Sequence, residues 1–104
     1  MNAAELLKRI RTESGPAVID VRTGFEYWSG HIPGAIHAPT WKIFFRIASL
    51  PGDREKELVV TCEHGPRAGL AAKLLGLYGY RRVQLLDGHM AGWRRSGYPL
   101  RKQD

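Results

Sequence analysis

The chain has very little cysteine: Cys62 is the single one among 104 residues. An internal disulfide is therefore excluded, and nothing in the sequence requires an oxidising compartment. A dithiol oxidoreductase is excluded as well, because its reactive cysteine needs a second one to resolve it. Cysteine and histidine also lack the spacing that is typical of metal ligands. We expect neither a metal nor a cofactor.

Long apolar runs are missing too. The longest candidate, residues 41–47, is interrupted by Lys42 and Arg46, so no segment is expected to span a bilayer. Residues 1–11 mix charged with apolar side chains and lack the continuous apolar region of a secretory signal. These absences favour a cytoplasmic protein that makes no contact with a membrane.

Charge of one sign is in excess but is not concentrated. Sixteen Lys and Arg against ten Asp and Glu give a net charge of +6. The basic residues lie in scattered pairs without a nucleic-acid-binding motif, so we expect no nucleic-acid partner. A general positive field instead suits a small anion or an acidic partner, or simply keeps the protein soluble.

Length and hydrophobic pattern predict one α/β domain over residues 1–104. Short apolar runs predict strands at 17–21, 35–38, 58–62 and 83–86. Helices are expected at 3–13, 40–49 and 66–78, with short helical turns at 23–29 and before Gly97. Thr40 is the expected cap of the second helix, and Leu70, Leu74, Leu75 and Leu77 are expected to face the core. The alternation predicts a mostly parallel sheet of four or five strands with helices on both faces.

Cys62 ends the apolar run 58–61 and precedes a short loop and a predicted helix. At this edge of a parallel sheet, loop N–H groups and the positive end of the helix dipole favour thiolate over thiol. A buried structural cysteine is the alternative for a lone Cys, and the residues that follow decide against it.

The loop after the cysteine reads Glu63-His64-Gly65-Pro66-Arg67. Gly65 permits a backbone conformation that a side chain would forbid, and Pro66 suits the first position of a helix. Such a loop can aim successive N–H groups inward and bind an anion. Arg67 adds a fixed positive charge suited to an oxyanion, whereas His64 is a candidate base or simply an exposed histidine.

Four segments in order resemble a single-domain rhodanese. They are Val18-Ile19-Asp20-Val21-Arg22, the stretch from Glu26 to Ile36 with Gly30-His31-Ile32-Pro33-Gly34, the loop 62–67, and Asp87-Gly88-His89 through Trp93 to Pro99. The resemblance implies a three-layer domain in which Cys62 takes sulfane sulfur from a donor such as thiosulfate. The resulting persulfide passes its sulfur to cyanide, a thiol or a protein acceptor.

The resemblance also implies roles for particular residues. Asp20 and Arg22 support the edge of the pocket, while His31, Pro33 and Gly34 belong to the architecture. The substrate-binding set, which cradles the persulfide, is Glu63, His64, Gly65, Pro66 and Arg67. We expect a monomer that uses a small anionic sulfur donor and an acceptor from outside the chain, because no second cysteine can reduce the persulfide.

Two residues depart from the usual family pattern. Glu63 stands where a basic residue is common, and its carboxylate is expected to raise the pKa of the cysteine and to repel an anionic donor. His89 stands where a second glycine is usual, and we expect this change to alter only a turn.

Two other functions remain open. A phosphatase or arsenate reductase of the related fold has five residues between cysteine and arginine, whereas residues 62 and 67 enclose four. The smaller ring suits sulfur better than phosphate. A non-catalytic binding or regulatory module keeps the fold without turnover, but the presence of both Cys62 and Arg67 counts against it.

Overall fold

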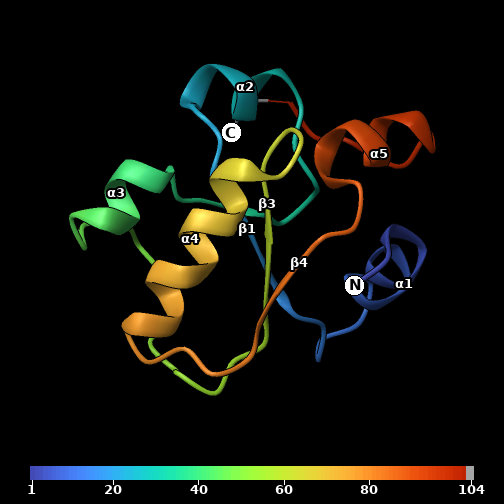
Figure 1. Ribbon diagram of the computed structural model, residues 1–104. Helices are drawn as coiled ribbons and strands as arrows, with labels where there is room; N and C mark the ends of the chain where they lie inside the picture. The colour runs from blue at the N-terminus through green and yellow to red at the C-terminus, as the bar shows by residue number, and fades with distance from the viewer. Residues whose placement is uncertain (103–104) are drawn as a thin grey trace.

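Short apolar segments form a parallel sheet in this computed structural model, which describes residues 1–102 (Figure 1). Within that range the strands are β1 (Ala17–Asp20), β2 (Ile36–His37), β3 (Leu58–Thr61) and β4 (Val83–Leu85), and the sheet order is β2-β1-β3-β4. Every pair is parallel, and Ile19 lies opposite both Ile36 and Val60. The predicted α/β fold is therefore confirmed, with four strands among the described residues.

Helices cover both faces of the sheet. They are α1 (Ala3–Arg9), α2 (Gly24–Ser29), α3 (Thr40–Phe44), α4 (Pro66–Leu77) and α5 (His89–Arg95). Figure 1 shows α3 and α4 on one side of the strands and α1 and α5 on the other, with α2 beyond one end of the sheet. No helix within residues 1–102 has the length and apolar character needed to cross a bilayer.

The sheet separates two buried cores, because successive side chains of a strand point to opposite faces. Ile19, Val60 and Cys62 pack on the side of α4, where the cluster includes Ala71 and Leu75. On the other side, Val18 and Val59 pack against residues of α1 and α5, among them Leu6, Met90 and Trp93. Cys62 is thus part of the core between the sheet and α4.

Two predicted helices are shorter than expected. The first, predicted to run to residue 13, ends at Arg9 because the hydroxyl and the N–H of Thr12 both donate to the Arg9 carbonyl, at 2.8 and 3.0 Å. The second, predicted to run to residue 49, ends at Phe44. Arg46 there adopts a positive φ of 60°, which does not continue an α-helix.

The prediction that Thr40 caps α3 was wrong. Pro39 occupies the cap position and makes no side-chain cap bond. The hydroxyl of Thr40 instead donates to the carbonyl of Val21 at 3.4 Å. This side chain therefore ties α3 to the segment that follows β1.

The predicted core face of α4 was partly wrong. Leu75 is buried and Leu74 is half-buried, but Leu70 and Leu77 are 53% and 79% exposed. The buried stripe consists of Ala68, Ala71 and Leu75, at spacings of three and four residues. Two alanines leave little side chain between the helix and the sheet, so α4 can pack close to the strands.

Parallel strands bring their carboxyl ends to one edge of the sheet. Arg22 follows β1, Cys62 follows β3, and His89 lies four residues beyond β4. Residues far apart in the sequence therefore meet at this edge, where α2 also lies (Figure 1).

Candidate active site

Cys62 follows β3 directly, and its side chain is fully buried. The N–H of Gly65 donates to its Sγ at 3.0 Å, which is the contact expected of a loop that stabilises a thiolate. Gly65 has a φ of 130°, a conformation that favours glycine, and Pro66 begins α4 immediately afterwards. Pro66 has no N–H, so it shapes the loop without donating to a bound group.

The first turn of α5 holds the backbone of the loop. The N–H of Met90 donates to the carbonyl of Cys62 at 3.0 Å, and the N–H of Ala91 donates to the carbonyl of Glu63 at 3.2 Å. In a trans peptide the N–H points away from the carbonyl, so the N–H groups of Glu63 and His64 point to the opposite side, into the loop. Neither of these two groups donates a hydrogen bond to any residue within 1–102.

His89 is the main residue that sequence reasoning missed, because its replacement of a glycine was expected to alter only a turn. It is buried, and its ring reaches back to β3. Nδ1 accepts the Cys62 N–H at 3.3 Å and lies 3.4 Å from the Thr61 hydroxyl oxygen. A Cβ built on Gly65 would lie 3.2 Å from Nε2, so the ring packs against the loop. The departure from the glycine pattern was the available signal.

Burial lowers the pKa of His89 below its ordinary value. Two nearby groups act in opposite directions: Asp87 raises this pKa and His64 lowers it. The imidazole is therefore neutral at physiological pH, as it must be to accept a hydrogen bond at Nδ1.

Arg67 is paired with a carboxylate rather than left open for an anion. Its two terminal nitrogens donate to the two oxygens of Glu26, at 2.6 and 3.0 Å. This bidentate contact lowers the pKa of Glu26 to about 2 and raises that of Arg67, and a bond from Thr23 adds to the shift of Glu26. Thr23 and Glu26 also form a capping box at the start of α2. The capping box is a sequence signal for the start of α2 but not for an ion pair with Arg67, and Glu26 was not among the predicted site residues.

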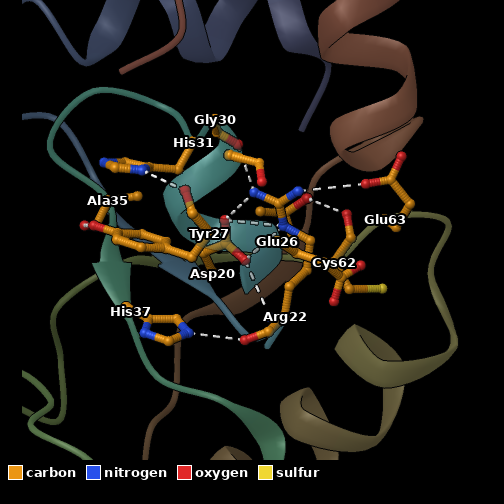
Figure 2. Close-up of polar contacts among 12 residues, drawn as sticks. Asp20, Arg22, Glu26, Tyr27, Gly30, His31, Ala35, His37, Cys62 and Glu63 are labelled. Carbon is orange, nitrogen blue, oxygen red and sulfur yellow. Dashed lines mark hydrogen bonds and ion pairs between the residues drawn. The ribbon is translucent and has the colours of Figure 1, made fainter. Parts of the chain in front are cut away.

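Asp20 and Arg22 form a buried ion pair at the edge of the loop (Figure 2). Nε and Nη2 of Arg22 donate to the carboxylate at 3.0 and 2.8 Å, and Nη2 also donates to the carbonyl of Gly30. Nη1 reaches Glu63 at 3.4 Å, and Glu63 forms a second ion pair with Arg94. Two guanidinium groups therefore share the carboxylate of Glu63 and offset its negative charge. Glu63 should then repel an anionic donor less strongly than the sequence alone suggests.

The segment with His31 forms a stacked support behind the ion pair. The ring of His31 stacks on Tyr27 with centroids 3.7 Å apart, and its Nδ1 lies 2.8 Å from the Tyr27 carbonyl. The hydroxyl of Tyr27 donates to Ala35 at 2.8 Å (Figure 2). Pro33 and Gly34 lie in the turn between His31 and Ala35, and Gly34 has a φ of 83°.

Two clefts meet at the Glu26–Arg67 pair. A cleft of about 320 Å³ is lined by Glu26, Arg22, Glu63 and Arg94, and an apolar one of about 410 Å³ has Arg67 on its wall. A larger cavity of about 510 Å³ lies at the other end of α4, near Tyr78, and takes no part in this site. Within residues 1–102, His, Cys, Asp and Glu form no group of three that could hold a metal ion.

Comparison with known proteins gives matches over nearly the whole chain. The family model described as Rhodanese-like domain matches residues 2–96. A protein named Sulfurtransferase from Allochromatium vinosum is 32% identical over 100 residues, which cover 96% of this chain and 92% of the relative. Thiosulfate sulfurtransferase GlpE from Pseudomonas savastanoi is 37% identical over 87 residues, covering 84% and 79%.

A relative of another kind is a longer protein. The HTH-type transcriptional regulator Rv0324 of Mycobacterium tuberculosis is 39% identical over 102 residues, and the match covers 93% of this chain but only 42% of the regulator. Among solved structures, the human single-domain sulfurtransferase TSTD1 superposes with a TM-score of 0.78 at 26% identity, covering 91% of this chain and 94% of that one.

Proposed function

The chain belongs to the Rhodanese-like domain family, and we propose that it is a sulfurtransferase that carries sulfane sulfur as a persulfide on Cys62. The observation that carries the proposal is the contact between Sγ and the Gly65 N–H, in a loop whose Glu63 and His64 N–H groups point inward. Sulfurtransferases among the relatives support the reaction class. Thiosulfate is the donor that the name of one relative suggests.

In the first half of the reaction, the Cys62 thiolate attacks the outer sulfur of thiosulfate. The sulfur–sulfur bond of the donor breaks, sulfite leaves with its electron pair, and a new sulfur–sulfur bond forms on Cys62. The terminal sulfur of this persulfide is negatively charged, and the N–H groups of Glu63, His64 and Gly65 would stabilise it. A nucleophilic acceptor then attacks the terminal sulfur and restores the thiolate.

The proposed binding residues divide the work. The loop N–H groups hold the sulfur. Arg67 releases the carboxylate of Glu26 and binds the sulfite portion of the donor in its place. Asp20 and Arg22 hold the loop from the β1 side through Glu63.

The test is to incubate the purified protein with thiosulfate and to measure its mass and its production of thiocyanate from cyanide. We expect one added sulfur atom on Cys62, together with turnover. Cys62→Ser should remove both while leaving the circular dichroism spectrum and melting temperature close to those of the wild type.

Two results would contradict the proposal. Absence of both persulfide and turnover with thiosulfate and with organic thiosulfonates would favour a binding or regulatory module. Hydrolysis of an aryl phosphate that depends on Cys62 would favour the phosphatase reading.

A further inference from the structure

His89 makes a contact with the reactive residue that the proposed sulfur transfer does not yet use. Its Nδ1 accepts the N–H of Cys62 at 3.3 Å, and the ring also contacts the loop at Gly65. His89 itself adopts a positive φ of 50°, which a side chain rarely adopts and glycine adopts freely. The unfavourable backbone conformation and the contact with Cys62 together indicate that the side chain of His89 has a function.

We propose that the neutral imidazole of His89 is a positioning group that holds Cys62 in the geometry required for sulfur transfer. This inference rests on the proposed function and deepens it, because it assigns a role to a side chain that contacts the cysteine backbone and not the substrate. His89 acts through the peptide of Cys62.

The hydrogen bonds around Cys62 explain how the ring would act. The N–H of Cys62 is held by His89, while its carbonyl is held by the N–H of Met90 at 3.0 Å and faces the Thr61 hydroxyl at 3.2 Å. Both polar groups of the residue are thus fixed from the α5 side. Rotation of this backbone would move Sγ relative to the Gly65 N–H, which lies 3.0 Å away.

The direction of the bond fixes the tautomer of the ring. Because Cys62 donates its N–H, Nδ1 carries a lone pair and the proton of the neutral ring lies on Nε2. A protonated ring would have N–H groups at both positions and would oppose the Cys62 N–H with another donor. Protonation of His89 therefore breaks the contact with Cys62.

Several ionisable groups surround this imidazole. The loop contributes His64, and the segment before α5 contributes Asp87. The ring contacts Cys62 itself through the backbone N–H. Asp87 itself lies 3.7 Å from the amino group of Met1, which partly offsets its charge. Burial and His64 lower the pKa of His89, and their effect exceeds the opposing effect of Asp87, so the ring stays neutral until the pH falls below the ordinary histidine value of 6.5.

Two substitutions separate the hydrogen bond from mere filling of space. His89→Gly suits the positive φ but removes the acceptor. His89→Asn tolerates the same backbone, and its side-chain oxygen takes the place of Nδ1 without titrating near neutral pH. Both variants should fold, since neither demands a new backbone conformation.

The first measurement is the single-turnover rate of persulfide formation from thiosulfate at saturating donor. We expect His89→Gly to lower this rate about tenfold with a smaller change in KM, and His89→Asn to recover most of the loss. The ratio of wild-type to His89→Asn rate should be constant above about pH 6.5 and fall below it. An unchanged rate in His89→Gly, or a constant ratio at every pH, would overturn the proposal.

A second measurement does not depend on activity. In nuclear magnetic resonance spectra, the Cys62 amide should shift with the same apparent pKa as the His89 ring, and this shift should vanish in both variants. A Cys62 amide that ignores the titration of His89 would also overturn the proposal. A wild-type protein that forms no persulfide would refute the proposed function instead, and the amide titration would still decide whether His89 holds Cys62.

Discussion

The charge that was expected to receive an anion already has a partner inside the protein. Arg67 directs both terminal nitrogens to Glu26, so in the proposed reaction a donor such as thiosulfate has to compete with a tethered carboxylate. Glu26 lies in α2, on the wall of the cleft that also contains Arg22 and Glu63. The single residue Glu26 therefore controls how available Arg67 is.

Replacing Glu26 by Gln should increase the apparent affinity for thiosulfate. The neutral amide holds the guanidinium less strongly, and relief of a contact worth about 1 kcal/mol lowers KM roughly fivefold. Steady-state kinetics with thiosulfate and cyanide measure the effect. Glu5→Gln removes the same charge from the exposed surface of α1 and is the matched control. A KM that rises, or that changes equally in both variants, would contradict competition at Arg67.

The same ion pair should appear in the pH dependence of stability. The pKa of Glu26 is lowered from 4.5 to about 2 in the folded protein. Its stabilising contribution is therefore complete above about pH 4.5 and is lost as the pH falls through about 2. Melting temperatures across this window should fall more steeply for the wild type than for Glu26→Gln. Parallel curves for the two proteins would show that the pair contributes nothing measurable.

Among the elements, α4 shows best what its sequence reveals and what it hides. The position of the helix after the cysteine and its start at Pro66 follow from local residues. The local residues do not show which leucines face inward. Leu70, Leu74, Leu75 and Leu77 lie too far around the helix to share one buried face, and the observed face consists of two alanines and Leu75. The tertiary packing against β3, which no local pattern encodes, selects Leu75.

Leu75 and Leu77 make a matched pair for a stability test. Leu75→Ala removes a fully buried side chain and should lower the free energy of unfolding by about 2–5 kcal/mol. Leu77→Ala, at a position 79% exposed, should change it by about 0.5 kcal/mol or less. Urea denaturation of both variants measures the difference. Equal losses would mean that the assignment of the buried face is wrong.

At the scale of the whole molecule, the excess of basic residues acts as a field. The net charge of +6 should speed the approach of the thiosulfate dianion, and salt should screen it. The rate constant for persulfide formation at low donor concentration is expected to fall as KCl rises from about 50 to about 500 mM. Methanethiosulfonate, with one negative charge, should show a weaker dependence. Identical slopes for the two donors would exclude a steering effect.

The overall architecture and the loop could be predicted from sequence because both depend on local patterns. The strands predicted at 17–21 and 58–62, observed as Ala17–Asp20 and Leu58–Thr61, depend on contiguous residues, as do the loop 62–67 and the helix after it. Two ion pairs of the site, Arg67 with Glu26 and Glu63 with Arg94, could not be predicted. They come from other elements, and only the folded sheet edge brings them together.

The backbone clamp by α5 has a consequence for the order in which the site is completed during synthesis. Cys62 and Glu63 leave the ribosome before Met90 and Ala91, whose N–H groups hold their carbonyls. A domain folds as a unit once its sequence is available, so the thiol exists for a time as an ordinary cysteine of a nascent chain. The loop reaches its reactive geometry only when α5 has docked. The thiol of a newly made chain is therefore not positioned for sulfur transfer until folding is complete.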